Sequence, residues 1–489
     1  MSELGGQVVS AARWSLLNTV VIRVGTFATG VVLARYFLSP RDWGLYAVGL
    51  LILAVLLSAN EMGVSLALVR WEREVRSFAP TVLTLSTAAS LLLYAVLYVT
   101  APVLARLLGS PDAVGVLRVL SLAVVIDGIA CVPAGGLTRR FAQRERMRVD
   151  LANFLVSTAV TVVLAATGFR AMSFAYGAVS GNLVALFGYA LAEPGMLRFG
   201  WDREQARALL RFGLPLAGAS LLVLAMLNVD SAVIGAVLGP TALGLYQIAF
   251  NVSSWPVRAV SETARRVSFA GFSRLAGSDS TLADGFGRGL RLLTAAAIPA
   301  CVLLGVLAEP LIRTVYGAQW VPAAGPLRFL AALGLLRVGF ELAYDCLSAV
   351  GRRRELIIVQ GGWLVALVPV LVLLAHRYGI TGVGVGHVLV AGLVALPGFL
   401  VALTRARVPV RVVVDAVGTP VLGGIVCGVL AWSTYRLLGT GAVSLFAAGT
   451  AGLAGYALVL LPTVRAWRRT RRGSAPPVPV HAEEATQGA

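Results

Sequence analysis

Apolar runs of about twenty residues or more recur along the whole chain, separated by short breaks that carry prolines, glycines or arginines. An α-helix needs about 20 apolar residues to cross a bilayer. The alternating segments typical of an outer-membrane barrel are absent from the sequence. The pattern predicts an all-α integral membrane protein with about fourteen transmembrane helices, at residues 14–38, 43–69, 80–108, 113–138, 149–168, 171–193, 209–238, 242–264, 290–315, 324–350, 355–376, 380–403, 410–436 and 441–464.

The composition agrees with this pattern and explains the net charge. Hydrophobic residues make up 58% of the chain and charged residues 13%, whereas about 25% is usual in soluble domains. The formal net charge is +18, carried by arginines. With the N-terminus inside, alternate loops hold 29 and seven arginines. This asymmetry follows the positive-inside rule, so we expect a cell-membrane protein with cytoplasmic termini, and no nucleic-acid partner.

An internal repeat defines the expected organisation. The segments "LSPRDWGLY" (38–46) and "LGPTALGLY" (238–246) share Leu, Pro, Gly, Leu and Tyr, and each follows the first helix of one half. Helix parity places both on the outer side, so the halves form a parallel repeat, as in some transporters. We expect a six-helix lobe at 1–193, a cytoplasmic linker at 194–208, a second six-helix lobe at 209–403, two further helices at 404–465 and a disordered cytoplasmic tail at 466–489.

Two longer stretches resemble a known family. "LARYFLSPRDWGLYAVGL" with "EMGVSLALVR", and "FGLPLAGASLLVLAMLNVDSAVIGAVLGPTALGLYQIAF", are similar to bacterial polysaccharide or O-antigen flippases of the multidrug/oligosaccharidyl-lipid/polysaccharide exporter superfamily. The resemblance implies two lobes around a cavity that opens to either side in turn. It implies a polyprenyl-pyrophosphate-linked oligosaccharide as substrate, for lipopolysaccharide or exopolysaccharide biosynthesis, and a polymerase and glycosyltransferases as partners. The two helices beyond twelve resemble lipid II flippases.

Three arginines within apolar helices are the candidate pyrophosphate ligands. Arg23 lies inside the first helix, Arg258 follows Pro256 in the eighth, and Arg337 begins a polar stripe in the tenth. An arginine in hydrocarbon costs about 2.5–3.5 kcal/mol even on insertion scales, so each should face water or a partner. A planar guanidinium suits bidentate phosphate binding. A structural salt bridge between Arg23 and Glu61 is the other interpretation.

Buried carboxylates are the candidate sites for coupling to H⁺ or Na⁺. A carboxylate in apolar surroundings can have its pKa raised into a useful range. The sequence does not decide which of them couples transport, and a packing role for the helix-7 acid is an equal alternative. The candidates are Glu61, Asp230, Glu262, Glu341 and Asp345.

Other functions are disfavoured by what the sequence lacks. We expect no enzyme, no metal site and no bound cofactor, because the four cysteines and three histidines are scattered, no lysine is present for a phosphate-binding loop, and the outer loops are short. A lipid II flippase and a drug or cation antiporter of the same superfamily remain as alternatives. The motif "GVGVGHV" (382–388) is interpreted as close helix packing.

Overall fold

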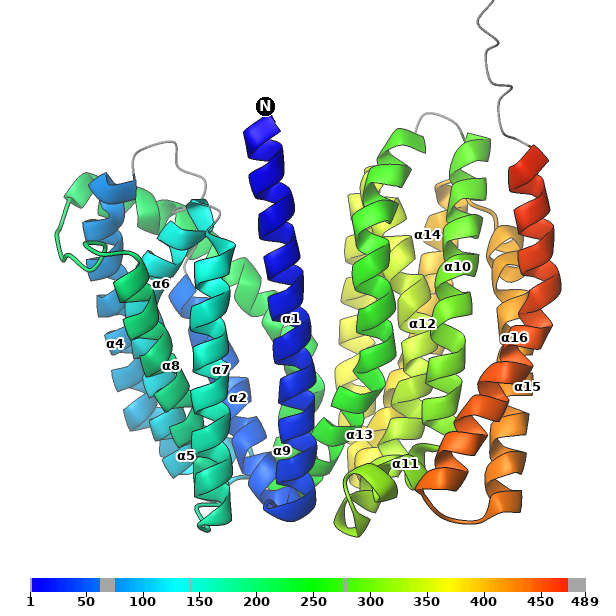
Figure 1. Cartoon of the computed structure of the whole chain (residues 1–489), viewed down its shortest axis with the longest axis horizontal. Coiled ribbons are helices and arrows are strands. Elements are labelled where there is room, and N and C mark those ends of the chain that lie inside the picture. The colour runs from blue at the N-terminus through cyan, green and yellow to red at the C-terminus, as the bar shows by residue number, and fades with distance from the viewer. Residues whose placement is uncertain (1, 62–74, 141, 276–278, 474–489) are drawn as a thin grey trace, which may run out of the picture. The chain divides into compact units, whose positions relative to one another are not determined.

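The computed structural model describes residues 2–61, 75–140, 142–275 and 279–473. Every regular element among these residues is helical, and the expected all-α membrane fold is confirmed. In chain order (Figure 1) they are α1 (Ser2–Tyr36), α2 (Pro40–Glu61), α4 (Val75–Leu107), η1 (Pro111–Ala113), α5 (Val114–Leu120), α6 (Leu122–Arg139), α7 (Gln143–Ala166), α8 (Met172–Ala192), α9 (Arg203–Leu275), α10 (Asp279–Val306), α11 (Ala308–Val315), η2 (Ala318–Ala323), α12 (Ala324–Ala349), α13 (Arg353–Val390), η3 (Ala391–Ala395), α14 (Leu396–Arg405), α15 (Val410–Leu438) and α16 (Ala442–Gly473).

Two of the long helices are each divided by one glycine. Within the described residues, twelve helical segments are long and apolar enough to span a membrane. Gly239 breaks α9 with φ 81° and ψ −177°, and Gly379 breaks α13 with φ 61° and ψ −148°. Residues other than glycine rarely adopt these backbone conformations. Each helix therefore consists of two arms, and the breaks fall between the helices expected at 209–238 and 242–264, and at 355–376 and 380–403.

The chain forms two compact units, each made of several segments. Unit 1 contains Met1–Trp255, Ala308–Leu336 and Arg353–Val401. Unit 2 contains Pro256–Leu307, Arg337–Arg352 and Ala402–Ala489. The division into lobes at 1–193 and 209–403 stays a prediction.

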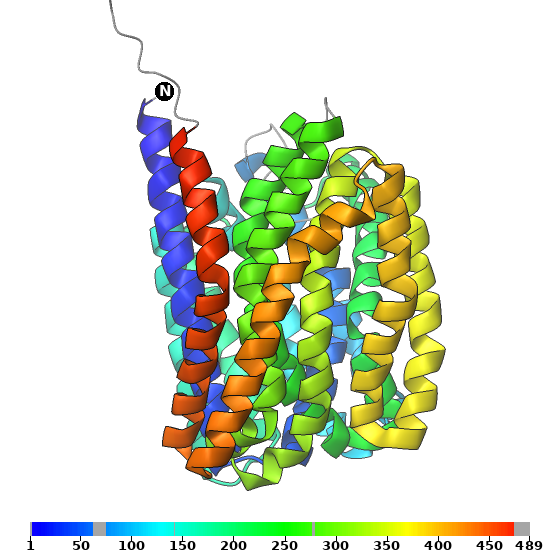
Figure 2. The ribbon, with the colours of Figure 1, turned by 90° about the vertical axis from the view of Figure 1, so that its right-hand side faces the viewer.

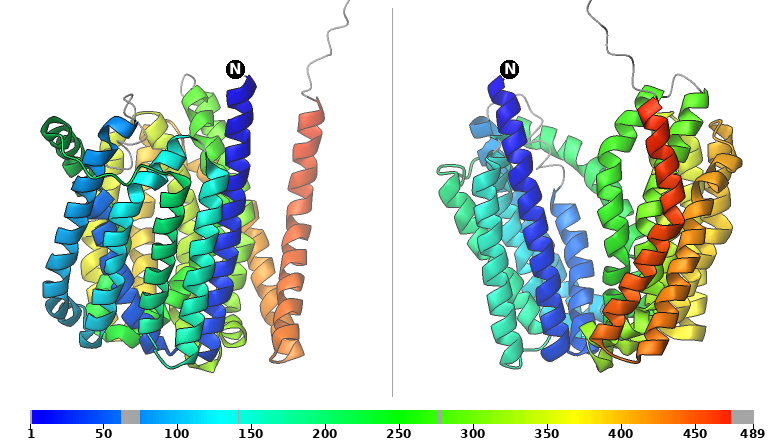
Figure 3. Two further views of the ribbon diagram at one scale, coloured as in Figure 1. Left: turned by 60° about the vertical axis from the view of Figure 1, so that its left-hand side comes forward. Right: turned by 45° about the vertical axis from the view of Figure 1, so that its right-hand side comes forward.

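Unit 1 is built on packed helix pairs. Helix α8 lies against α7, α6 and α5, while α1 lies along α7 (Figure 3). A buried cluster of Phe78, Val82, Val132 and Leu209 fills the space between α4, α6 and the start of α9. Helix α1 contributes little to this core, because most of its side chains between residues 13 and 32 are exposed or half-buried.

The internal repeat extends beyond the motif that revealed it. A Cβ added at Gly188 on α8 would lie 2.8 Å from Val149 of α7, and one at Gly398 would lie 3.1 Å from Val359 of α13. These residues are 210 positions apart in each case, and "LVALFGY" (183–189) matches "LVALPGF" (393–399) at the same offset. The same helix-to-helix contact therefore occurs in both halves of the sequence.

Unit 2 centres on α10, α15 and α16 (Figure 2). The Tyr456 hydroxyl donates a hydrogen bond to the Ala295 carbonyl at 2.9 Å, joining α16 to α10. Leu307, Ala431 and Ala448 form a separate buried cluster in the same unit. Helix α16 continues to Gly473, past residue 466 where the disordered tail was expected to begin. Arginine is a good helix former, so the arginine-rich end extends the helix.

Candidate functional site

The two copies of the repeat motif pack against each other reciprocally in unit 1. A Cβ at Gly44 would lie 1.7 Å from the Pro240 carbonyl oxygen, and one at Gly244 would lie 1.9 Å from the Pro40 carbonyl oxygen. Backbone therefore approaches backbone at a distance that only glycine permits. We call these four residues the glycine–proline crossing. Because each glycine meets the proline of the other motif, the contact has the form of an interface between two related halves.

Hydrogen bonds to the end of α1 hold the segments next to the crossing. The indole Nε1–H of Trp320, a fully buried residue of η2, donates to the Ala34 carbonyl at 2.8 Å. Gln319 donates to the same carbonyl at 3.1 Å and to that of Leu38 at 3.3 Å. Arg35 donates to the Thr314 and Val315 carbonyls. Residues about 280 positions apart are thus joined next to the first repeat motif.

A buried polar cluster lies on α9 and α13 of unit 1. Asp230, which is 4% exposed, accepts hydrogen bonds from the Tyr246 hydroxyl at 2.7 Å and from the backbone N–H of Ser231 at 2.7 Å. His387, 8% exposed, places Nε2 at 3.5 Å from the same carboxylate oxygen as Tyr246. This separation permits an ion pair when the imidazole is protonated, but Nε2 makes no hydrogen bond in the described structure. We call Asp230, His387 and Tyr246 the Asp–His–Tyr cluster.

This cluster occurs in one half of the repeat alone. At the offset of 200 set by the motif, Asp230 corresponds to Gly30, and at the offset of 210, His387 corresponds to Gly177. The position of Tyr246 is retained as Tyr46, whose ring stacks on Phe174 at a centroid distance of 4.0 Å. The Asp230–His387 pair therefore breaks the internal symmetry of the chain.

The predicted pyrophosphate ligands are divided between the two units. Arg23 is exposed on α1 of unit 1. Arg258 is exposed on α9, and Arg337 is half-buried on α12; both belong to unit 2. A common site for Arg23 with the other two arginines stays a prediction.

Two of the predicted coupling carboxylates belong to unit 2. Glu341 is half-buried on α12, and Asp345, one turn further along, is 8% exposed. Glu61 is the last residue of α2 and Glu262 lies on α9, but both side chains fall outside the described residues. The suggested pair between Arg23 and Glu61 therefore stays a prediction. In the part of the chain that the structure describes, no three His, Cys, Asp or Glu residues are grouped as metal ligands.

Sequence reasoning singled out Asp230 but missed its partners. His387 lies in "GVGVGHV", which was interpreted as a packing segment, and Tyr246 entered only as a matched letter of the repeat motif. Aligning the two halves at the offsets of 200 and 210 would have shown that Asp230 and His387 stand where the first half has Gly30 and Gly177.

Comparison with known proteins provides relatives in sequence. A family model described as "Polysaccharide biosynthesis protein" matches residues 32–325. The lipopolysaccharide biosynthesis protein WzxC of Escherichia coli (strain K12) is 25% identical over 68% of each chain. The succinoglycan biosynthesis transport protein ExoT of Rhizobium meliloti (strain 1021) is 27% identical over 65% of this chain and 64% of its own. The teichuronic acid biosynthesis protein TuaB of Bacillus subtilis (strain 168) is 23% identical over 72% and 73%.

Solved structures share the fold. Lipid II flippase MurJ in an inward closed conformation aligns with a TM-score of 0.73 and 15% identity, over 94% of this chain and all of that one. An inward-facing multidrug resistance MATE family transporter of the MOP superfamily aligns with a TM-score of 0.61 and 18% identity, over 79% and 94%. At these identities the match concerns the helical fold.

Proposed function

Because the chain belongs to the polysaccharide biosynthesis protein family, we propose that it moves a polyprenyl-pyrophosphate-linked oligosaccharide across the bacterial inner membrane, from the cytoplasmic to the outer leaflet. The family match over residues 32–325 is the observation that carries this proposal. Its relatives are named for lipopolysaccharide, succinoglycan and teichuronic acid biosynthesis, three different polymers. A shared lipid carrier with differing sugars accounts for relatives of one family serving different polymers. A polymerase and glycosyltransferases are the proposed partners.

The proposed pyrophosphate ligands are Arg23, Arg258 and Arg337. Arg23 lies ten residues into the span that begins at Arg13, about 15 Å along the helix at 1.5 Å per residue. It is exposed there, and exposure to hydrocarbon would cost about 2.5–3.5 kcal/mol. An aqueous path beside α1 would remove this cost. The guanidinium would then bind phosphate oxygens in bidentate fashion.

The glycine–proline crossing is the proposed outer closure of unit 1. Both motifs lie on the outer side in the predicted topology, and their backbones meet without intervening side chains. Such a contact seals a path without large side chains having to be moved. Alternating access would separate the two motifs when the cargo leaves toward the outer leaflet.

The Asp–His–Tyr cluster is the proposed site of proton coupling. A carboxylate and an imidazole buried in membrane-spanning helices are costly and are usually retained for a function. The Asp230 carboxylate is contacted by His387 from α13, by the Tyr246 hydroxyl from the second arm of α9 and by the backbone N–H of the adjacent Ser231. A proton taken up or released within the cluster would change the charge buried between α13 and α9, and with it the attraction between these two helices.

A lipid II-type cargo is the second candidate function. The structure of lipid II flippase MurJ aligns over 94% of this chain. Both cargoes carry a polyprenyl pyrophosphate, so the proposed arginine site serves either one. The sugar portion distinguishes them, and the transport assay below includes both.

Translocation of a fluorescent polyprenyl-pyrophosphate oligosaccharide in proteoliposomes tests the proposal. Wild type should move the probe, and Arg23→Ala or Arg258→Ala should lower the rate at least about tenfold, the loss expected from one charge-assisted phosphate contact. Arg377→Ala, at an exposed arginine on α13, is the matched control and should retain transport. Absence of transport by folded wild type would overturn the proposal. Faster transport of fluorescent lipid II than of the oligosaccharide would favour the second candidate.

Coupling is measured in the same vesicles. An imposed proton gradient should change the rate for wild type, and Asp230→Asn or His387→Gln should abolish this response. A response that persists in both variants would exclude the cluster as the coupling site.

A further inference from the structure

The first turns of α9, ahead of the candidate membrane span Leu227–Arg258, form an amphipathic helix. The Asp202 carboxylate accepts the backbone N–H groups of Glu204 and Gln205 at 2.9 and 3.1 Å, which caps the helix. The Asp202 N–H donates to the Thr81 hydroxyl of α4 at 3.1 Å. Leu209 is buried against Phe78 and its neighbours on α4 and α6. The start of the helix is therefore held in place on three sides.

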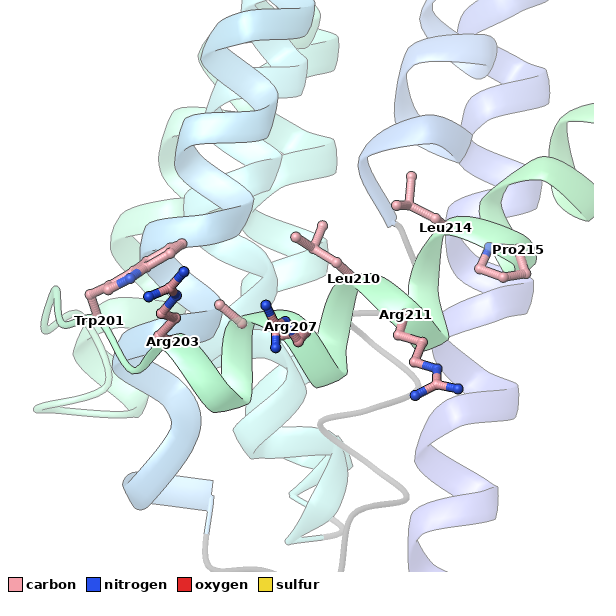
Figure 4. A pocket seen from close by; sticks show the side chains of 8 residues that line it. Trp201, Arg203, Arg207, Leu210, Arg211, Leu214 and Pro215 are labelled. Carbon is pink, nitrogen blue, oxygen red and sulfur yellow. The ribbon is translucent and has the colours of Figure 1, made fainter.

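Three arginines recur at every fourth position on one face of this helix. Arg203, Arg207 and Arg211 are exposed and about 6 Å apart along the helix axis, at 1.5 Å per residue. They line a pocket of about 540 Å³ (Figure 4). The complete lining is Trp201, Arg203, Ala206, Arg207, Leu210, Arg211, Leu214 and Pro215.

The lining combines three positive charges with apolar surface and contains no acidic residue. Trp201 is 62% exposed and Leu214 is 58% exposed, although both are large and apolar. In Figure 4, Leu210 and Leu214 point to one side of the helix and Arg211 points to the other. Aromatic and apolar side chains beside arginines are typical of segments at a membrane–water interface. The pocket is therefore suited to a lipid with an anionic headgroup.

We infer that this pocket binds the diphosphate headgroup of the polyprenyl-linked oligosaccharide on the cytoplasmic side, before the cargo enters the transport path. The inference rests on the proposed function, which it deepens by adding a first docking site. Neighbouring arginines one turn apart engage the two phosphates of one headgroup in bidentate fashion. Leu210 and Leu214 contact the first isoprene units, and the Trp201 ring provides a stacking face for the first sugar.

A diphosphate lipid fits this pocket better than a bulk phospholipid does. Phosphatidylglycerol offers one phosphate, which would occupy one of the three arginines, whereas a diphosphate occupies an adjacent pair. The volume falls in the range of small-ligand sites, about 300–1,000 Å³, so the pocket accommodates a headgroup together with part of a sugar.

Photolabelling tests the inference directly at the pocket. The full chain is placed in phosphatidylcholine nanodiscs with a polyprenyl diphosphate that carries a photoactivatable group next to the phosphates, and the labelled peptides are mapped. Wild type should be labelled within residues 201–215. Arg207→Gln/Arg211→Gln should need at least about tenfold more probe for the same labelling, as expected for the loss of charge-assisted contacts. Arg353→Gln/Arg354→Gln, two exposed arginines on α13, is the charge-matched control and should behave as wild type.

Competition identifies the headgroup. Unlabelled polyprenyl diphosphate should compete at least about tenfold better than polyprenyl monophosphate or phosphatidylglycerol. Equal competition by phosphatidylglycerol would overturn the inference in favour of a bulk phospholipid site. Unchanged labelling of the pocket-arginine variant would also overturn it.

Parallel transport assays separate this inference from the proposed function. Transport by wild type together with unchanged labelling of the pocket variant means that the docking site is wrong and the function stands. If wild type is labelled specifically and the pocket variant is not, but wild type transports nothing, the diphosphate site stands and the transport function fails.

Discussion

The Pro240 carbonyl oxygen occupies the place where a side chain at Gly44 would begin, 1.7 Å from an ideal Cβ. The relation between Pro40 and Gly244 is the same at 1.9 Å. Two nine-residue motifs that match in sequence thus also fit each other in space. The same residues of each motif therefore have two roles. They form the turn after the first helix of their half, and they leave a flat surface against which the other motif packs.

Gly44→Ala should therefore destabilise the protein although alanine favours helices. The added methyl meets backbone, which cannot rotate away, and overpacking of this kind typically costs about 1–3 kcal/mol. Thermal unfolding in detergent should show a lower Tm for Gly44→Ala and for Gly244→Ala. Gly361→Ala is the control, because Gly361 is an exposed helical glycine with open space around its Cα. Its Tm should stay equal or rise, since alanine gains up to about 1 kcal/mol over glycine in a helix. A Tm for Gly44→Ala as high as that of the control would contradict the close contact.

The Asp230–His387 pair should show measurable coupling in a double-mutant cycle. Free energies of unfolding are measured for wild type, Asp230→Asn, His387→Asn and the double variant. Residues in direct contact typically couple by about 0.5–3 kcal/mol, whereas distant residues add independently. Additive effects of the two substitutions would show that Asp230 and His387 do not interact energetically.

Trp320→Phe should isolate the contribution of one buried hydrogen bond. Phenylalanine keeps most of the ring in its fully buried position but leaves the Ala34 carbonyl without the indole donor. A typical hydrogen bond contributes about 0.5–1.5 kcal/mol net, so unfolding free energy should fall by that amount. Trp432→Phe, at an indole that is 53% exposed, is the control and should change little. Equal losses for the two variants would assign the effect to ring size and not to the hydrogen bond.

The helical fold was predictable because each span is encoded locally. About twenty apolar residues specify a crossing whatever surrounds them, and arginine asymmetry specifies the expected orientation. The breaks at Gly239 and Gly379 followed from short polar or glycine-containing segments between apolar runs. These features need no knowledge of which helix lies beside which.

The partners within the candidate site were not predictable in the same way. Asp230 attracted attention as a charge in an apolar helix, but its histidine partner lies 157 positions further along the chain. Whether His387 faces α9 depends on the rotation of the second arm of α13, which the backbone at Gly379 sets. Likewise, the motif around Pro40 indicated a repeat, but only the three-dimensional structure shows that the two copies are in contact. Local patterns identify the residues that need an explanation, whereas packing identifies what they contact.

The Asp202 cap gives a prediction that links local structure to the docking pocket. Asp202→Ala removes the acceptor for two helix-end N–H groups, which typically costs about 0.5–2 kcal/mol. Hydrogen exchange of the Glu204 and Gln205 amides should become about two- to thirtyfold faster, the equivalent of that free energy. Photolabelling of the pocket should weaken in parallel, because Arg203 and Arg207 lose their fixed spacing. Asp202→Asn keeps an oxygen acceptor without the charge, so it should restore both exchange protection and labelling. If Asp202→Asn behaved like Asp202→Ala, the negative charge and not the hydrogen-bonded cap would be responsible for ordering the helix. If exchange accelerated while labelling stayed unchanged, the arginines would bind the headgroup without needing a preformed helix.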